Sequence, residues 1–253
     1  MTGTRKSFDA THGSPVCPPA DHPQDDLEPN DPELYERLAD QWWQPRGPFA
    51  MLHWLAAARA RLVPAPHPGA VLVDLGCGAG LLAPHVRGYR HIGVDTSQSA
   101  LRQARARGVR TIRGDVLALP LPDGCADVVV AGEVLEHVHD LAGAVAEACR
   151  LLRPGGLLVL DTLADTALCR FVAITVAERV GLAPPGVHDP ALLVDREALA
   201  RECARGGVHV ELQGIRPSLP GLLAWSVRRG TAVRMVPTAT TAVLFQGTGR
   251  KKG

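Results

Sequence analysis

Three glycines stand at alternate positions directly after a short apolar run at residues 71–73. The run leads into Asp74, and Gly76, Gly78 and Gly80 follow it. Because glycine lacks a Cβ, such a loop allows tight backbone angles and the close approach of a ligand. Ligands of open α/β sheets bind beyond the carboxyl ends of the strands, which is where this loop would lie. The loop therefore predicts a binding site, and an ordinary strand-to-helix turn is the alternative interpretation.

Acidic residues follow the next two short apolar runs. Asp95 lies at the distance from the glycine loop expected for an acid that binds ribose hydroxyls. Its carboxylate can accept hydrogen bonds from both hydroxyls of a vicinal diol, and it can also cap a helix that begins at about residue 98. Asp115 and Val116 follow the third run, where an aspartate can accept a hydrogen bond from an adenine amino group. These positions indicate a cofactor with a ribose and an adenine.

A nicotinamide dinucleotide is the natural rival, because its enzymes also combine glycines with a later acid. Their GxGxxG fingerprint requires Gly or Ala three positions after the second glycine. That position holds Leu81 here, and the third glycine, Gly80, comes one residue early. The spacing disfavours a dinucleotide.

A second group of chemically competent residues follows the fourth apolar run. Glu133, Glu136 and His137 are spaced i, i+3 and i+4, so in a helix they share a face and can converge on one divalent cation. In the alternative interpretation no metal is present, Glu133 contacts the cofactor, and His137 is a lone general base or a buried structural histidine. His188 is a second candidate base, or it orients a loop through Asp189.

The elements that must position these residues alternate along the chain. Short β-rich runs and helical stretches follow one another, which predicts a mostly parallel sheet with helices on both faces. We expect an α/β, doubly wound, seven-stranded sheet with N-terminal helices and a helical insertion after the fifth strand. The expected strands are 71–73, 91–94, 111–113, 127–131, 157–160, 208–212 and 239–245, and the expected helices include 31–38, 49–62, 80–86, 98–107, 141–152 and 195–205.

Domain boundaries follow from composition. Residues 1–30 are polar and rich in proline, which predicts a disordered tail, and residues 250–253 are expected to form a second, solvated tail. One catalytic domain is expected between them, at 31–249, with an insertion or lid at 163–194.

Composition also excludes several function classes. The formal net charge of +1 leaves no basic footprint for nucleic acid. The six cysteines form no CxxC pair, so neither a zinc knuckle nor a redox pair is indicated. With no signal peptide and no membrane-spanning run, we expect a cytoplasmic protein that binds a small-molecule acceptor. Its oligomeric state is left open.

The insertion carries an apolar segment with flanking arginines. We expect it to cover the site and to be able to touch a membrane surface as a peripheral contact. A helix packed on the core is the alternative. The residues concerned are Phe171, Val172, Ile174, Val176 and Val180, with Arg170 and Arg179.

With these residues in view, the chain resembles the class I methyltransferases that use S-adenosylmethionine. More narrowly, it is similar to the ubiquinone-biosynthesis O-methyltransferases, which methylate polyprenylated catechols and hydroxyphenols. The likeness runs from about Tyr35 to near the C-terminus. It is carried by ADQWW at 39–43, VDLGCG at 73–78, EVLEHV at 133–138, RPGG at 153–156 and GVHD at 186–189.

The resemblance implies roles for individual residues. The backbone around Gly76 would hold the methionine end of S-adenosylmethionine, and Asp95 would hold its ribose. Arg59 would pair with the cofactor's carboxylate. The resemblance also associates the Glu-x-x-Glu-His run with a divalent metal such as magnesium. The full set expected at the cofactor is Arg59, Asp74, Gly76, Gly78, Gly80, Asp95, Asp115, Val116, Gly132 and Glu133.

Three departures from the family pattern lie close to the site. Tyr35 stands where the family usually carries Phe, Gln41 where it carries Arg, and Gly132 where it has a larger residue that lines the cofactor pocket. We expect O-methyl transfer to a phenol or catechol such as a polyprenylated quinone precursor. The alternatives are methylation of a glycan or natural product, and a non-catalytic cofactor-binding protein.

Overall fold

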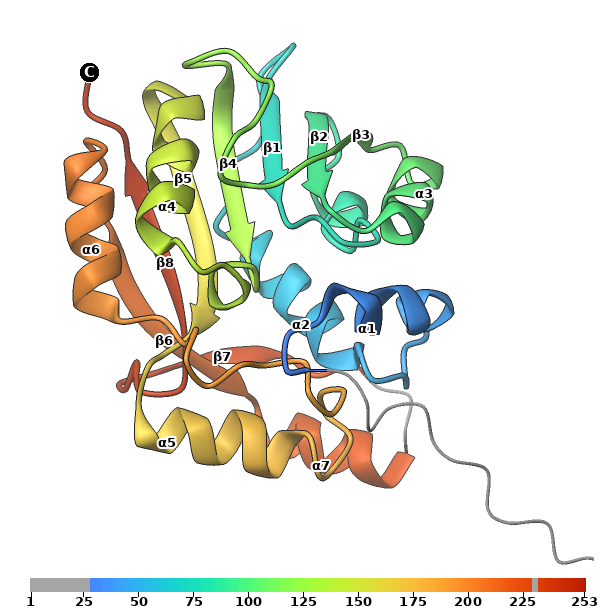
Figure 1. Ribbon diagram of the computed structural model, residues 1–253. Helices are drawn as coiled ribbons and strands as arrows, with labels where there is room; N and C mark the ends of the chain where they lie inside the picture. The colour runs from blue at the N-terminus through green and yellow to red at the C-terminus, as the bar shows by residue number, and fades with distance from the viewer. Residues whose placement is uncertain (1–27, 229–231) are drawn as a thin grey trace, which may run out of the picture.

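The computed structural model describes residues 28–228 and 232–253, which form one twisted sheet covered by helices (Figure 1). The strand order is β3-β2-β1-β4-β5-β8-β6-β7. Strands β1 to β5 are parallel to one another. Strand β8 is antiparallel to both of its neighbours, β5 and β6. The strands are β1 (Val71–Leu75), β2 (Arg90–Asp95), β3 (Arg110–Arg113), β4 (Ala126–Gly132), β5 (Leu152–Leu163), β6 (Glu211–Pro217), β7 (Met235–Thr238) and β8 (Leu244–Arg250).

The predicted doubly wound α/β class is confirmed, with eight strands in place of the expected seven. The additional strand is β7, which pairs only with β6 at the edge of the sheet. It contains Pro237, and proline in a sheet is tolerated at an edge because it cannot donate a ladder hydrogen bond. Because proline argues against a strand in a sequence, this strand was not predicted.

The central strands are apolar on both faces because both faces are covered by packed segments. Val129 of β4 packs into a cluster with α4 (Leu141–Leu151) and α6 (Arg196–Arg205). Its neighbours Val128 and Val130 point into a separate cluster on the other face, with residues 60–63 and 82–86. Alternate residues of a strand point to opposite faces, so β4 reads as a continuous apolar run.

Strand register brings the expected site residues to one edge of the sheet. Asp74 of β1 pairs with Gly93 of β2 and with Val130 of β4. The carboxyl ends of β1, β2 and β4 therefore lie side by side, and helices α1 (Pro32–Arg37) and α2 (Ala50–Arg59) lie across that end of the sheet (Figure 1). As expected, α1 begins after Asp31, whose side chain accepts a hydrogen bond from the Glu33 N–H.

Three local expectations were wrong. The stretch after the glycine loop is a single 3-10 turn, η2 (Ala83–His85), because Pro84 stands in it and no longer helix follows. Residues 250–253 are not a free tail, since Arg250 ends β8 and the Lys251 ammonium donates to the carbonyls of Cys149 and Leu152 at 2.8 and 2.9 Å. Asn30 belongs to the fold and lies at the site described below. Most of the predicted tail, residues 1–27, lies outside the described residues.

The insertion after β5 packs on the core through one side. Helix α5 (Ala167–Cys169) continues into a π-helix, η4 (Arg170–Ala177), and Cys169 and Ala173 are buried against α2. An unexpected helix, α7 (Leu219–Arg228), joins the same cluster, with its Trp225 edge-on to Trp54 of α2. This side of the insertion is thus a helix packed on the core, and its outer apolar side chains remain exposed.

Candidate active site

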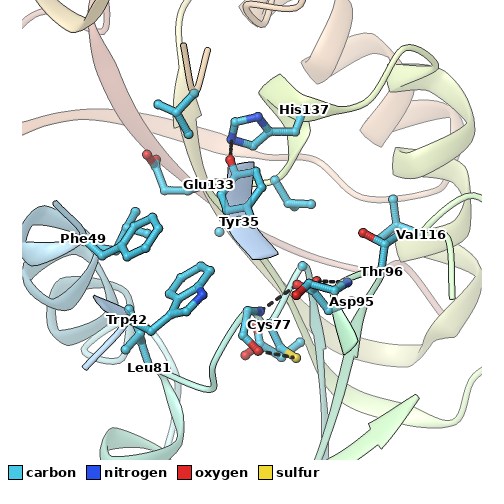
Figure 2. A pocket seen from close by; sticks show the side chains of 18 of the residues that line it. Tyr35, Trp42, Phe49, Cys77, Leu81, Asp95, Thr96, Val116, Glu133 and His137 are labelled. Atoms are coloured by element: carbon cyan, nitrogen blue, oxygen red, sulfur yellow. Dashed lines mark hydrogen bonds between the residues drawn. The ribbon is translucent and has the colours of Figure 1, made fainter. Parts of the chain in front are cut away.

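A cavity of about 370 Å³ lies where the carboxyl ends of β1, β2 and β4 meet α1 and α2. Figure 2 shows its labelled side chains converging from these separate elements. The expected residues that line it are Arg59, Asp74, Gly76, Gly78, Asp95, Asp115, Val116, Gly132, Glu133, His137 and His188. Residues more than 100 positions apart in the chain are therefore brought together as the sequence predicts.

The glycine loop forms one wall of the cavity and requires glycine at two positions. Gly76 and Gly78 have φ values of +64° and +50°, which side-chain-bearing residues rarely adopt. A Cβ at Gly76 would lie 2.5 Å from Val134, and one at Gly78 would lie 2.8 Å from the Trp42 ring. The loop therefore presents bare backbone to a ligand.

Gly80 does not belong to the cavity, which corrects the prediction for this residue. Its φ is +79°, and a Cβ there would meet the backbone of Ala104 in α3 (Gln98–Ala106) at 3.0 Å. Gly80 is needed so that the loop can pack on α3. Because packing and ligand approach both call for glycine, sequence spacing could not separate them.

The two tryptophans of the Trp-Trp pair serve different purposes. The Trp42 ring stacks on Phe49 at 4.2 Å and lines the cavity, and its buried Nε1–H has no hydrogen-bond partner in the described residues. Trp43 instead donates to the Ala79 carbonyl at 3.2 Å, while the Arg107 guanidinium lies 3.5 Å over its ring. Trp43 therefore holds the glycine loop, and Trp42 offers a free donor to a ligand.

Asp95 fixes the loop and retains capacity for a ligand. One carboxylate oxygen accepts from the Gly78 N–H and the other from the Ser97 N–H, both at 2.8 Å. Burial raises the pKa of Asp95, while these two amides lower it in part. Because a carboxylate has about four lone-pair sites, both oxygens can still accept from a vicinal diol. The capping and diol roles proposed for this residue are thus compatible.

Asp115 and Val116 line the far side of the same cavity. Asp115 accepts from the Leu117 N–H through Oδ1 at 3.0 Å, and Val116 is buried. An apolar side chain beside a carboxylate suits a flat heterocycle that carries an amino group. The arrangement is compatible with the expected adenine contact.

Arg59 is held by an acid that the sequence interpretation overlooked. Its Nε and Nη2 donate to the two carboxylate oxygens of Asp161 at 2.7 and 2.6 Å, a bidentate pair buried inside the protein. Burial opposes the charge of Arg59, but the Asp161 carboxylate outweighs burial and raises the pKa of the guanidinium. Asp161 lies within the apolar strand β5, where a single acid had no motif to mark it.

Gly132 provides the room that Arg59 occupies. A Cβ at Gly132 would lie 1.8 Å from the Arg59 Cζ atom. The departure from the family pattern at position 132 is therefore a packing requirement of Arg59 in this chain. Asp74, also on the cavity wall, is paired with His91 at 3.2 Å.

Glu133 and Glu136 face different surroundings, so the predicted metal site is not formed. Glu133 has φ +51° and lies before the 3-10 turn η3 (Leu135–His137), so the run is not the α-helix that the i, i+3, i+4 argument requires. Glu133 lines the cavity, whereas Glu136 is buried behind it and accepts from the Thr162 hydroxyl at 2.7 Å. Among the described residues, no three His, Cys, Asp or Glu side chains are arranged to hold an ion.

Burial raises the pKa of both carboxyls. Burial, followed by the nearby Glu136 and Asp161, raises the pKa of Glu133 well above its usual value. Burial likewise raises the pKa of Glu136 to about 7. One oxygen of each has no hydrogen-bond partner among the described residues, so Glu133 has an unused polar atom at the cavity.

His137 lines the cavity, and both its ring nitrogens have partners. Nδ1 lies 2.7 Å from the Asn30 amide oxygen, and Nε2 lies 3.3 Å from the Tyr35 hydroxyl (Figure 2). Burial, followed by the neighbouring His188, lowers the pKa of His137 to about 3. The ring is therefore neutral at physiological pH.

His188 supports His137, and its ring contacts Glu178 and not Asp189, through which it was expected to orient a loop. The two imidazole rings stack with centroids 5.8 Å apart. The Nδ1 atom of His188 lies 3.4 Å from a Glu178 carboxylate oxygen. Asp189 instead accepts from the Ala191 N–H. Of the two candidate bases, His137 has the nitrogen that contacts a hydroxyl.

Comparison with known proteins agrees with this geometry. Residues 73–160 match the model of a methyltransferase domain. The chain is 37% identical over 234 residues to a ubiquinone biosynthesis O-methyltransferase of Methylobacterium sp., covering 81% of this chain and 92% of the relative. The corresponding protein of Thiobacillus denitrificans is 35% identical over 190 residues, covering 70% of this chain and 82% of that protein.

The chain belongs to the ubiquinone biosynthesis O-methyltransferase family. It is an S-adenosylmethionine-dependent methyltransferase, as the resemblance predicts. Its fold matches a solved S-adenosylmethionine-dependent methyltransferase from Thermotoga maritima with a TM-score of 0.63 and 20% identity, covering 87% of this chain and 99% of the other. The glycine cradle, the unpartnered Trp42 donor and the free carboxylate capacity of Asp95 fit that cofactor.

Proposed function

We propose that this methyltransferase transfers the methyl group to the hydroxyl oxygen of a phenol or catechol, with Nε2 of His137 as the proton acceptor. The observation that carries the proposal is the contact between Nε2 and a phenolic hydroxyl, that of Tyr35, inside the cofactor cavity. A substrate phenol at this position would make the same hydrogen bond. His137 and the glycine loop would then face the acceptor from two sides.

S-adenosylmethionine supplies an electrophilic methyl group, so the protein must align the acceptor oxygen and accept its proton. The lowered pKa keeps His137 neutral and its lone pair available. As the oxygen bonds to carbon, its proton becomes strongly acidic, because the oxygen is then cationic. Transfer to a weakly basic imidazole is therefore favourable at that moment.

The cofactor's methionine end would lie at Gly76 and the free nitrogen of Arg59. Nη1 of Arg59 makes no hydrogen bond among the described residues, while Nε and Nη2 are held by Asp161. A guanidinium fixed in this way can offer its remaining N–H groups to a carboxylate without losing side-chain entropy on binding. Asp95 would hold the ribose, and Asp115 with Val116 the adenine.

The acceptor's remaining atoms would meet an apolar wall. The cavity is also lined by apolar side chains at the start of α2 and in the insertion: Phe49, Met51, Leu52, Leu182 and Val187. Such a wall favours an aromatic acceptor with an apolar substituent over a sugar. Together with the names of the relatives, it supports a polyprenylated catechol or hydroxyphenol.

No metal ion takes part in this proposal. Glu136 is turned toward Thr162, and both ring nitrogens of His137 already have partners, so the residues as placed do not converge on an ion. The proton is accepted by an imidazole, and the acceptor is oriented by the cavity wall.

We also propose a peripheral membrane contact through the outer faces of η4 and α7. Phe171, Val180 and Leu223 are 59%, 61% and 67% exposed, and Arg170 and Arg179 flank the first two. Apolar side chains beside cations are typical of segments that lie in the interface of an anionic bilayer. No described helix is long and apolar enough to cross a membrane.

Vesicle flotation tests this contact. We expect binding to vesicles with anionic lipid, weaker binding to zwitterionic vesicles, and loss of binding in a Phe171→Ser, Val180→Ser variant that still binds S-adenosylhomocysteine. Equal flotation of the variant, or none by the wild type, would leave η4 as a helix that only packs on the core.

Acceptor profiling tests the proposed reaction. The purified protein is incubated with S-adenosylmethionine and catechols, hydroxyphenols, sugars and carbon acceptors. We expect O-methylated catechol, with kcat/KM rising as a prenyl chain is lengthened. Transfer confined to sugars or carbon would replace the proposed acceptor class, and tight cofactor binding without turnover on any acceptor would indicate a binding protein.

A further inference from the structure

The side-chain amide of Asn30 contacts His137 at two points. Its Nδ2 donates to the backbone carbonyl of His137 at 3.2 Å, and its Oδ1 lies 2.7 Å from the ring Nδ1. The carbonyl can only accept, so it requires the NH₂ end of the amide. The oxygen end is thereby turned toward the ring, and it too can only accept.

This orientation determines where the imidazole proton lies. Nδ1 must donate to Oδ1 of Asn30, so the neutral ring carries its hydrogen on Nδ1 and its lone pair on Nε2. The Tyr35 hydroxyl, 3.3 Å from Nε2, is then the donor in that contact. In the opposite tautomer, two lone pairs would face each other across the 2.7 Å contact with Asn30.

We propose that Asn30 is a positioning residue that fixes the reactive tautomer and ring orientation of His137. The proposal rests on the proposed function, in which Nε2 accepts the acceptor's proton. A neutral imidazole with its hydrogen on Nε2 could not do so. Asn30 thus acts through His137 and touches neither the cofactor nor the acceptor.

The backbone at Asn30 is shaped for this role. Its φ is +65°, a left-handed conformation that asparagine tolerates better than most residues. The turn directs the side chain toward η3, while the chain continues into the helix cap at Asp31.

Asn30 also ties His137 to the insertion in a closed set of contacts. Its N–H donates to the Gly186 carbonyl at 2.9 Å. The Gly186 N–H donates to Glu178 at 3.0 Å, Glu178 contacts His188, and His188 stacks on His137. The contact between the Asn30 side-chain amide and Nδ1 of His137 closes this set of contacts. The position of the insertion and the tautomer of the base are therefore set by the same residue.

With this tautomer, His137 can take up the proton that is released when the methyl group is transferred. The acceptor oxygen forms a bond to the methyl carbon, the carbon–sulfur bond breaks, and its electron pair goes to sulfur. The acceptor's proton moves to Nε2, which yields an imidazolium. Its Nδ1–H still donates to Oδ1 of Asn30, so the positive charge forms beside an oriented amide dipole.

Nitrogen NMR of ¹⁵N-histidine-labelled protein, with no acceptor present, tests the proposal directly. Protonated and unprotonated ring nitrogens resonate far apart, and the His137 signals among those of the ten histidines are assigned by their loss in His137→Gln. We expect Nδ1–H in the wild type, the same in Asn30→Asp, which keeps the acceptor oxygen, and a shift toward Nε2–H in Asn30→Leu. A wild-type proton on Nε2, or unchanged shifts in Asn30→Leu, would overturn the proposal.

Cofactor binding and turnover complete the test. Asn30→Leu should bind S-adenosylhomocysteine as the wild type does, and Asn30→Ala replaces it if the leucine variant does not fold. With a prenylated catechol as probe, kcat should fall about 100-fold, the lower end of what a general base contributes, with KM for S-adenosylmethionine unchanged. Wild-type kcat in Asn30→Leu would overturn the role of Asn30 and leave the proposed function intact. A protein that methylates no phenol would overturn the function, while the tautomer result would still stand.

Discussion

Gly132 and Arg59 fit together so closely that no side chain can be added at position 132. A Cβ there would lie 1.8 Å from the Arg59 guanidinium carbon, and Arg59 is itself clamped by Asp161. The cavity-lining cation Arg59, its counter-ion Asp161 and the glycine at the end of β4 therefore form one packed unit. Changing any of the three should alter both stability and cofactor binding.

Gly132→Ala tests this unit. The added methyl must push the guanidinium away from Asp161, and overpacking a tight interior costs about 1–3 kcal/mol. We expect Tm to fall by about 2–4 °C for each kcal/mol lost, and S-adenosylhomocysteine affinity to weaken by calorimetry. Gly114→Ala is the matched control, because it also lines the cavity but its new Cβ would meet only Leu119 and Ile112, at 3.9 and 4.0 Å. Equal effects in both variants would contradict the packing argument.

Asp95→Ala should weaken cofactor binding while the sheet remains folded. Each hydrogen bond from the ribose diol to a charged acceptor contributes about 1.5–3 kcal/mol, which is roughly a tenfold loss or more. Part of the loss will come from the loop, since Asp95 also accepts from Gly78 and Ser97. Asp95→Asn retains one carbonyl acceptor and should lose less. Calorimetric affinities equal to the wild type in both variants would remove Asp95 from the ribose site.

Tyr35→Phe should leave the chemistry intact and ease acceptor binding. The hydroxyl that donates to Nε2 of His137 has to be displaced before an acceptor can use the same lone pair. One such hydrogen bond contributes about 0.5–1.5 kcal/mol net, so kcat/KM for the acceptor should rise by roughly 2- to 10-fold. A large fall in kcat would show instead that Tyr35 relays the proton.

Much of this site follows from the sequence because its parts lie at strand ends. The alternation of buried strands and helices predicted the sheet, and register then placed Gly76, Asp95 and Gly132 at one edge. Asn30 and Asp161 could not be predicted in the same way. Each acts on a residue more than 100 positions away in the chain, and neither belongs to a local pattern.

The metal prediction failed for a local reason. It assumed that residues 133–137 form an α-helix, but the positive φ of Glu133 places this residue outside the short turn that holds Glu136 and His137. Helix α7 was missed because Pro220 and Gly221 stand in its first turn, where they read as a loop. Its apolar contacts with α2 override that local preference.

The loss of folding stability at low pH should depend most on Asp127, which lies at the end of the sheet opposite the cavity. Burial tends to raise its pKa, but hydrogen bonds from the Val71 N–H, His67 and Arg153 outweigh burial and lower it to about 2. A depressed folded-state pKa gives stability that is present above the unfolded value of about 4 and is lost as pH falls toward 2. Denaturant unfolding between pH 5 and 2 should show a shallower pH dependence in Asp127→Asn. Asp123→Asn, at an exposed ion pair, is the control and should follow the wild type.

His137 is proposed to accept the proton of a phenolic hydroxyl whose oxygen receives the methyl group. The most direct measurement compares the wild type with His137→Gln, using S-adenosylmethionine with a deuterated methyl group and a prenylated catechol, with products identified by mass spectrometry and NMR. We expect a deuterated methyl group on oxygen in the wild type. In His137→Gln, kcat should fall by about 100-fold or more, with S-adenosylhomocysteine affinity unchanged. Wild-type turnover in His137→Gln, or a label on carbon, would contradict this proposal.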